Sequence, residues 1–145
     1  GGISFGNIFM ESITKSTEET KRIAIELAGK VHKGSVLALY GNLGSGKTTF
    51  TRYFVEALGL NNRVQSPTFV VARKYGYVNH VDLYRLTSEN EAKDIGIEEM
   101  LTDSDSLTLI EWPEIIENIL PKNSVKIYFE YIDENTRKIT IENLH

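Results

Sequence analysis

The chain has 145 residues, 41% of them hydrophobic, with 16 lysine and arginine residues, 20 aspartate and glutamate residues, and no cysteine. A chain of this length can bury an ordinary core without disulfides. The lack of cysteine excludes thiolate catalysis and cysteine-based metal sites, and it favours a reducing compartment, so we expect a cytoplasmic protein. The net charge of -4 disfavours a protein that holds nucleic acid through a basic face of its own.

A single domain is expected from Met10 to the C-terminus, residues 10–145. The chain opens with Gly1 and Met10 is its first methionine, so we treat residues 1–9 as an added or flexible segment outside the fold. No internal repeat or low-complexity linker divides the remainder. The longest apolar run, Val36–Tyr40, is far shorter than the roughly 20 residues that a membrane-spanning helix needs.

The first part of the sequence predicts a helix, a strand and a second helix. Ser16 and Glu19 have the spacing of a capping box, which indicates a helix start. One apolar stripe follows, and the helix is expected to end near Gly34; the stripe consists of Ile23, Ala24, Leu27, Ala28 and Val31. Val36–Tyr40 is typical of a strand buried on both faces, and residues 49–58 are typical of an amphipathic helix.

The second part predicts mainly short strands. Segments with the length and pattern of strands are 69–75, 77–81, 107–110 and the two arms of a C-terminal hairpin, 125–131 and 139–141. Between them, residues 88–101 are acidic and mostly helical in character, with an interruption at Gly96.

Residues 41–48 match the phosphate-loop pattern G-x-x-x-x-G-K-[ST] at every position. In order they are Gly41, Asn42, Leu43, Gly44, Ser45, Gly46, Lys47 and Thr48. The glycines let backbone N–H groups turn toward an anion at a helix start. Lys47 can then reach the outer phosphates, and the Thr48 hydroxyl can bind Mg²⁺. The alternative is a glycine-rich turn that merely carries a lysine.

This loop lies between a buried strand and a helix, which is the arrangement that phosphate binding requires. We therefore expect an α/β protein with a three-layer fold like that of phosphate-loop NTPases. Its central sheet is expected to be largely parallel and flanked by helices, with a β-hairpin at the C-terminus.

Asp82 and Glu111 are the candidate carboxylates for a metal ion. Each follows a predicted strand, and the carboxyl ends of strands border the ligand crevice of an α/β sheet. Strand quality alone favours Glu111, because the stretch before Asp82 contains Asn79 and His80. The alternative is that either acid is a solvated residue that closes a strand.

Three further positions are candidates for the site. Thr68 follows Ser66 and Pro67 where related enzymes carry a mobile segment that senses the terminal phosphate, although Ser-Pro is also ordinary turn chemistry. Trp112 is expected on a turn near the crevice, because Pro113 disfavours helix there, with core packing as the alternative. Arg85 either reads the phosphate state or meets a partner, unless its apolar neighbours simply belong to the core.

Four segments together resemble the TsaE (YjeE) family. They are residues 41–49, the Ser-Pro-Thr-Phe at 66–69, the His-Val-Asp-Leu-Tyr-Arg-Leu at 80–86 and the Ile-Glu-Trp-Pro-Glu at 110–114. Their order and spacing match along nearly all of residues 13–144. The resemblance implies a small ATPase with ATP and Mg²⁺ as cofactors, needed for the threonylcarbamoyladenosine modification of tRNA. It also implies TsaD and TsaB as protein partners, with tRNA reached only through the complex.

Carried over position by position, the resemblance assigns phosphate and Mg²⁺ to the loop and its continuation through Thr49. It makes Thr68 a switch-like threonine and Asp82 the acid of the second nucleotide motif. Glu111, paired with Trp112, is placed at the metal or its water.

The resemblance also suggests contacts with the nucleotide outside the loop. Ser16 or Thr17, at the start of the first helix, become candidate adenine contacts. Arg137 matches an arginine of the C-terminal hairpin. Asn42 departs from the aspartate of many members, at a position that contributes mainly its backbone.

The residues favour in-line attack of water on the terminal phosphoryl group, with Lys47 and Mg²⁺ stabilising the charge. No residue is an obvious arginine finger, although Arg85 and Arg137 are candidates, so the chain alone is expected to be slow and to need a partner. A small-molecule kinase and a nucleotide-dependent scaffold remain the alternatives. A GTP switch is disfavoured, because the sequence contains no Asn-Lys-x-Asp and no Asp-x-x-Gly segment.

Overall fold

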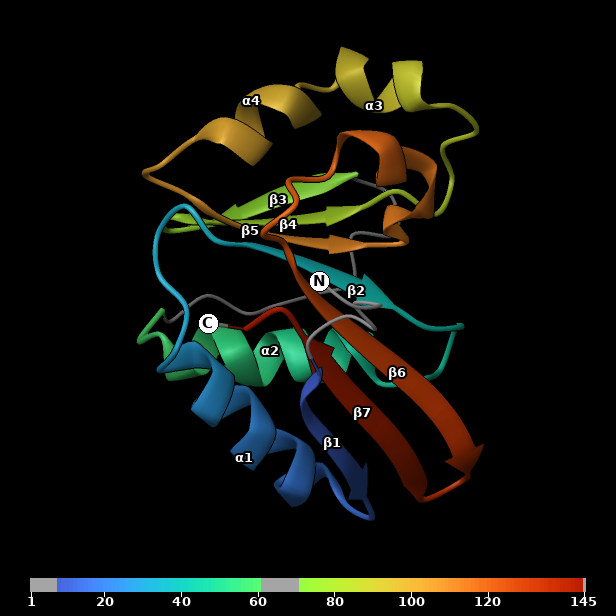
Figure 1. Ribbon diagram of the computed structural model, residues 1–145. Coiled ribbons are helices and arrows are strands. Elements are labelled where there is room, and N and C mark those ends of the chain that lie inside the picture. Colours follow the sequence, from blue (N-terminus) through green and yellow to red (C-terminus); the bar gives the residue numbers. More distant parts are fainter. Residues whose placement is uncertain (1–7, 61–70, 145) are drawn as a thin grey trace, which may run out of the picture.

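The computed structural model describes residues 8–60 and 71–144, in which helices cover both faces of one mixed β-sheet (Figure 1). The elements are β1 (Ile8–Thr14), α1 (Thr17–Ala28), β2 (Val36–Tyr40), α2 (Lys47–Ala57), β3 (Ala72–Tyr75), β4 (Val78–Asp82), α3 (Glu89–Asp94), α4 (Ile97–Thr102), β5 (Leu107–Glu111), the 3-10 helix η1 (Pro113–Ile119), β6 (Val125–Asp133) and β7 (Thr136–Glu142). Within these ranges no helix has the length and apolar character needed to cross a membrane.

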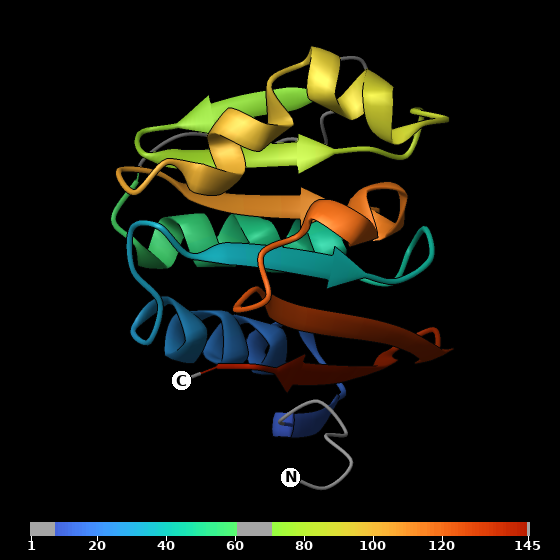
Figure 2. The ribbon, with the colours of Figure 1, turned by 45° about the horizontal axis from the view of Figure 1, so that its top comes forward.

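The sheet is mixed rather than largely parallel, which corrects the expectation from the sequence. Its strands run in the order β1-β7-β6-β2-β5-β4-β3. The pairings β2–β5, β2–β6 and β4–β5 are parallel, whereas β3–β4, β6–β7 and β1–β7 are antiparallel. The reason is that the predicted C-terminal hairpin is not an appendage. Its first arm, β6, lies beside β2, so the hairpin continues the central sheet in antiparallel fashion (Figure 2).

Strand β1 was not predicted. It forms one edge of the sheet and pairs with β7 from Ile8 to Thr14. It therefore begins two residues before Met10, inside the segment that was expected to lie outside the fold. Its residues IFMESIT alternate only weakly between apolar and polar, and its pairing partner lies at the opposite end of the chain.

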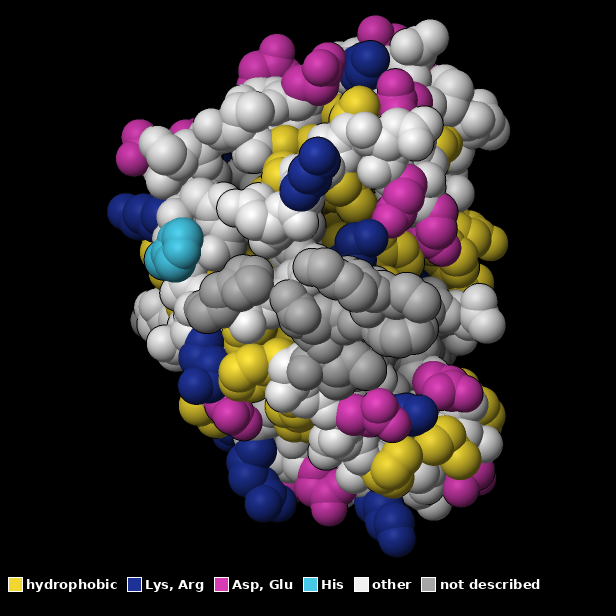
Figure 3. Space-filling model, viewed as in Figure 1, with side chains coloured by type: hydrophobic (Ala, Val, Ile, Leu, Met, Phe, Trp, Pro, Cys, Tyr) yellow, Lys and Arg dark blue, Asp and Glu magenta, His cyan; other side chains and the backbone are white. Residues whose placement is uncertain are grey.

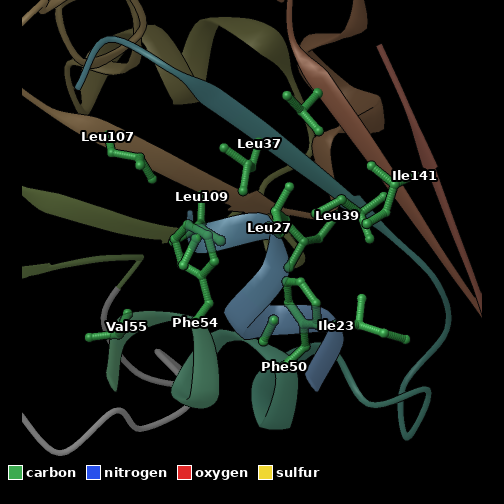
Figure 4. Packing of buried hydrophobic residues seen from close by; sticks show 14 of the residues in the cluster. Ile23, Leu27, Leu37, Leu39, Phe50, Phe54, Val55, Leu107, Leu109 and Ile141 are labelled. Atoms are coloured by element: carbon green, nitrogen blue, oxygen red, sulfur yellow. The ribbon is translucent and has the colours of Figure 1, made fainter. Parts of the chain in front are cut away.

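Alternation along the strands produces two cores, one on each face of the sheet. On the face covered by α1 and α2, Leu37 and Leu39 of β2 pack with Phe50 and Phe54 of α2 (Figure 4). The ring of Phe50 meets Phe129 of β6 edge-on, with centroids 5.3 Å apart. On the other face, α3, α4 and η1 cover a second cluster: Val36, Val81, Leu83, Ala92, Ile97, Leu101, Ile110 and Ile116.

Two helix boundaries differ from those predicted. Helix α1 ends at Ala28 instead of near Gly34, because Gly29 caps it. Helix α2 begins at Lys47, inside the phosphate-loop pattern. The 3-10 helix η1 begins only at Pro113, and Trp112 before it has a left-handed, non-helical backbone, so the expectation that Pro113 keeps Trp112 out of a helix is confirmed. The predicted interruption at Gly96 is confirmed between α3 and α4.

Candidate functional site

The loop from Gly41 to Gly46 joins β2 to α2 at the carboxyl end of the parallel strands. Gly41, Gly44 and Gly46 all have positive φ, of 149°, 78° and 103°. At Gly41 a Cβ atom would lie 2.7 Å from both the Phe129 carbonyl oxygen and the Ser45 hydroxyl oxygen. Only glycine therefore fits where the loop passes Phe129 of β6. Gly46 is the N-cap of α2 and offers no side-chain cap, which leaves the first N–H groups of the helix open to an anion.

Lys47 is buried at the start of α2, with 4% of its surface exposed. Its ammonium donates to the Gly41 carbonyl and lies 4.0 Å from the centroid of the Trp112 ring. Burial lowers the pKa of Lys47, and the nearby carboxylates, chiefly Glu111 and then Asp82, act in the opposite direction. A buried cation surrounded mainly by a carbonyl and an aromatic face retains capacity for an anionic ligand.

Asp82 and Glu111 are direct neighbours across the parallel pair β4–β5. The Asp82 carboxylate accepts a hydrogen bond from the Tyr84 backbone N–H at 2.9 Å, and burial raises the pKa of Asp82. Glu111 is more deeply buried, with 3% of its surface exposed. Its Oε2 lies 2.6 Å from Nε2 of His80, a residue with no exposed surface. The structure thus brings both predicted acids to the same end of the sheet.

A cleft of about 280 Å³ unites the phosphate loop with these acids. It is lined by Leu43, Gly44, Ser45, Gly46, Lys47, Thr48, Thr49, Asp82, Glu111, Trp112 and Arg137. The Ser45 hydroxyl is buried beside it and has no hydrogen-bond partner among the described residues. An orphaned hydroxyl, free helix N–H groups and a buried lysine are together suited to a phosphate chain.

The candidate metal ligands fit Mg²⁺ better than a transition metal. Within residues 8–60 and 71–144 there is no group of three or more His, Cys, Asp or Glu side chains arranged to hold a metal ion. What converges on the cleft is the Thr48 hydroxyl with two carboxylates, Asp82 and Glu111. Mg²⁺ is commonly held in this way, by one or two carboxylates together with phosphate oxygens and water.

A second cavity, of about 190 Å³, adjoins the loop on the side of α1 and the hairpin. Ser16 and Thr17 line it together with Ser45, Gly46 and Thr49 of the loop region. Arg137 lines both cavities, and its Nη2 donates to the Gly44 carbonyl at 3.2 Å. The positions suggested as adenine contacts therefore lie beside the phosphate loop, although they are far from it in sequence.

Some predicted positions have other outcomes. Thr68, with Ser66 and Pro67, lies outside the described residues. Trp112 has a left-handed backbone, with φ 56°, and its ring lines the cleft. The residues after Asp82 lie in different environments. Leu83 is buried in the core, whereas Tyr84 is exposed and packs on Trp112, with ring centroids 4.9 Å apart. Arg85 is exposed.

His80 is the site residue that was not predicted from the sequence. Its position in the His-x-Asp segment suggested only a less apolar strand. The signal that could have found it is the two-residue period of a strand, which puts His80 and Asp82 on one face. Because β4 pairs in parallel with β5, that face also contains Glu111.

A family model and named relatives indicate one family, and a solved structure has a similar fold. The family described as "Threonylcarbamoyl adenosine biosynthesis protein TsaE" matches residues 14–139. The "tRNA threonylcarbamoyladenosine biosynthesis protein TsaE" of Bacillus subtilis (strain 168) is 39% identical over 131 residues, covering 88% of this chain and 81% of that protein. The protein of the same name from Rickettsia bellii (strain RML369-C) is 38% identical over 138 residues, covering 92% of this chain and 94% of that protein. The crystal structure of Bacillus subtilis YdiB superposes with a TM-score of 0.76 at 31% identity, covering 94% of this chain and 86% of that one.

Proposed function

The chain belongs to the TsaE family of threonylcarbamoyl adenosine biosynthesis proteins, and from that premise we propose that its cleft binds ATP with Mg²⁺ and hydrolyses the terminal phosphoryl group. The observation that carries the proposal is the convergence of a buried lysine, an uncapped helix start and two neighbouring carboxylates on one cleft. The domain predicted at residues 10–145 acts as one ATPase unit with a phosphate-loop NTPase-like fold, extended at its start by Ile8 and Phe9 of β1.

Each group in the cleft has a distinct part in hydrolysis. The backbone N–H groups of the loop and the Lys47 ammonium bind the outer phosphates, while Ser16, Thr17 and Arg137 face the remainder of the nucleotide. Thr48, Asp82 and Glu111 would hold Mg²⁺, directly or through its water, and the bound ion would neutralise phosphate charge. These roles follow from the chemistry that each side chain can offer.

Glu111 orients the attacking water. The water oxygen forms a bond to the terminal phosphorus as the bond from that phosphorus to the bridging oxygen breaks, which yields ADP and phosphate. Glu111 accepts a hydrogen bond from the water and receives its proton as the new bond forms. Thr68, as the switch-like threonine, would complete this arrangement from its segment outside the described residues.

Hydrolysis serves the tRNA modification through an assembly with TsaD and TsaB in the cytoplasm. Two exposed apolar side chains support a protein partner at the cleft mouth: Leu43, at 69% exposure in the loop, and Tyr84, which packs on Trp112. Acidic side chains gather over α3 and α4, a surface that disfavours direct contact with tRNA (Figure 3). The tRNA is then held through the complex.

The chain alone is expected to hydrolyse ATP slowly. Among the described residues Arg137 is the arginine that lines the cleft, and its guanidinium donates to the backbone carbonyls of Gly44, Asp133 and Thr136. It is therefore engaged in holding the loop and the hairpin, and a partner would have to complete the charge stabilisation.

The test is the ATP hydrolysis rate of the chain alone and with purified TsaD and TsaB, with Lys47→Ala as the blank. We expect a large rise with the partners that the variant lacks. An unchanged rate would contradict the assembly-driven ATPase. It would favour a small-molecule kinase, or a nucleotide-dependent scaffold in which hydrolysis is incidental.

A further inference from the structure

We propose that His80 is a positioning residue: its Nε2–H fixes one oxygen of the Glu111 carboxylate, so that the other oxygen is held toward the cleft. The inference rests on the proposed function, in which Glu111 acts on Mg²⁺ or its water. His80 itself does not line the cleft and acts only through Glu111.

The contact is short and almost completely removed from solvent. Nε2 of His80 and Oε2 of Glu111 are 2.6 Å apart, and the exposed fractions of the two side chains are 0% and 5%. Both residues belong to paired central strands, β4 and β5, which also carry Asp82 at the same end. A hydrogen bond between two such strands has little freedom to change its geometry.

The chemistry of the two groups fixes the direction of the bond. As a carboxylate, Glu111 can only accept, so Nε2 of His80 carries the hydrogen. Nδ1, the other ring nitrogen, is buried without a hydrogen-bond partner among the described residues. The imidazole thus has one polar contact in the described part of the chain, and that contact is Glu111.

Burying the His80 imidazole with an unpaired nitrogen would be unfavourable if the side chain served packing alone. A buried ring nitrogen without a hydrogen-bond partner is destabilising relative to a paired one. A leucine would fill a position of this kind without that cost, as Leu109, the residue opposite His80 on β5, does in the same core. The benefit of the histidine therefore lies in what it does to Glu111.

Without the His80 donor, Glu111 has an obvious competing partner. That partner is the buried Lys47 ammonium, whose pKa Glu111 raises more than any other nearby acid does. A carboxylate released from His80 is free to turn toward that ammonium, which would take it away from the metal and occupy the phosphate-binding cation. His80 therefore keeps the acid and the lysine available for separate tasks.

The test compares amide side chains of two lengths at position 80. In His80→Gln the amide nitrogen reaches about as far as Nε2, whereas in His80→Asn it reaches only about as far as Nδ1. The readout is the gain in ADP affinity on adding Mg²⁺, measured by titration calorimetry without any turnover. We expect His80→Asn to lose about fivefold of that gain and His80→Gln to keep most of it.

Asn79→Leu is the matched control. Asn79 is also buried on β4, but its Nδ2 donates to the Thr108 hydroxyl at 3.2 Å and makes no contact with Glu111. This variant is expected to lower the melting temperature while it leaves the Mg²⁺ gain intact. In a Glu111→Gln background, His80→Asn is expected to cause no further loss of the gain, because its effect passes through the carboxylate.

Three results would overturn the inference: an unchanged gain in His80→Asn, equal losses in His80→Asn and His80→Gln, or an equal loss in Asn79→Leu. A natural chain that binds ADP no better with Mg²⁺ than without it would contradict the proposed function itself, and the role of His80 with it. The two failures are therefore distinguished by the unmodified protein.

Discussion

Two polar clusters lie on opposite faces of the central strands, and each contains a lysine and a glutamate. The cleft cluster consists of Lys47, His80, Asp82 and Glu111, on the face that α2 covers. The outer cluster consists of Tyr40, Glu117, Lys126 and Tyr128, on the face that η1 covers. Alternation along β2 and β6 separates them, since Leu39 and Ile127 point into the α2 core.

The polar groups of the outer cluster pair with one another. Glu117 accepts from the Tyr40 hydroxyl at 2.8 Å and from the Lys126 ammonium at 2.9 Å, and the Tyr40 ring stacks on Tyr128 with centroids 4.8 Å apart. Its two charges are partly exposed, at 28% for the Lys126 side chain and 45% for Glu117. Pairing with Glu117 raises the pKa of Lys126. A solvated and paired set of this kind has structural value only.

The cleft cluster is buried, but some of its hydrogen-bonding and charge-pairing capacity is unused. Burial lowers the pKa of Lys47, the opposite direction to that of Lys126, and raises the pKa of Asp82. The Ser45 hydroxyl beside them lacks a partner among the described residues. Burial with unused bonding capacity, rather than charge alone, therefore distinguishes a ligand site from a structural cluster.

Removing the charge of Glu111 should produce the largest loss of turnover. We expect Glu111→Gln to lower the ATP hydrolysis rate by about 1,000-fold and Mg-ADP affinity by no more than about tenfold, because a glutamine cannot take the proton of the attacking water. Steady-state kinetics and calorimetry on the same preparation would measure both. Equal losses of turnover and affinity would instead assign Glu111 a structural role.

Gly41→Ala is expected to damage both the loop and the fold. The added Cβ would meet the Phe129 carbonyl and the Ser45 hydroxyl at 2.7 Å, at a φ of 149°. We expect a loss of about 2–4 kcal/mol in unfolding free energy and of at least about tenfold in nucleotide affinity.

Gly59→Ala separates clash from backbone strain. Gly59 also has a positive φ, of 80°, but beyond its chain neighbours no described atom lies within 4 Å of the position that an added Cβ would take. The substitution should cost only about 1 kcal/mol and leave nucleotide affinity unchanged. Equal effects of the two variants, measured by denaturant unfolding, would contradict a close approach at Gly41.

Arg137→Ala should have a moderate effect confined to the cleft. It removes the hydrogen bond to the Gly44 carbonyl and a positive charge from both cavities, so we expect nucleotide affinity to fall about fivefold. Lys138→Ala is the control on the next residue, where an exposed ion pair with Glu11 at 2.9 Å is lost. Equal affinities for the two variants would remove Arg137 from the site.

Tyr40→Phe should have the smallest effect, with a specific pH dependence. Burial, and then the hydrogen bond to Glu117, raises the pKa of Tyr40 above its ordinary value of 10.0. The folded chain therefore keeps a proton that the unfolded chain loses, so the stability contributed by Tyr40 is complete below pH 10.0 and declines as the pH rises further.

In unfolding experiments, Tyr40→Phe should cost at most about 1 kcal/mol near neutral pH, and the difference from the unmodified chain should shrink above pH 10.0. ATP hydrolysis should be unaffected. A difference that stays constant with pH, or a loss of hydrolysis, would show that the outer cluster is not merely structural.

Local sequence patterns predicted the parts of the molecule that depend on neighbours in the chain. The phosphate loop, the buried strand before it and the break at Gly96 were predictable, because glycine positions and apolar runs determine them locally. Asp82 and Glu111 were predictable as strand-end acids, and the parallel pairing of β4 and β5 makes them neighbours.

Other features depend on pairing between distant segments, which a single sequence does not reveal. Strand β1 exists because β7 offers it an edge, and the parallel contact of β6 with β2 makes the sheet mixed. The contact between His80 and Glu111 joins residues 31 positions apart and depends on strand register. The role of Thr68 stays a prediction.

The most direct test of the difference between the two clusters is calorimetric titration of Mg-ADP into three proteins: the unmodified chain, Lys47→Ala and Lys126→Ala. The two lysines lie on opposite faces of the sheet. Lys47 is buried in the cleft with bonding capacity left for a ligand, whereas Lys126 is paired with Glu117. We expect Lys47→Ala to lose at least about 30-fold in affinity and Lys126→Ala to stay within about twofold of the unmodified chain. Binding that survives in Lys47→Ala, or falls equally in Lys126→Ala, would contradict the placement of the nucleotide in the cleft.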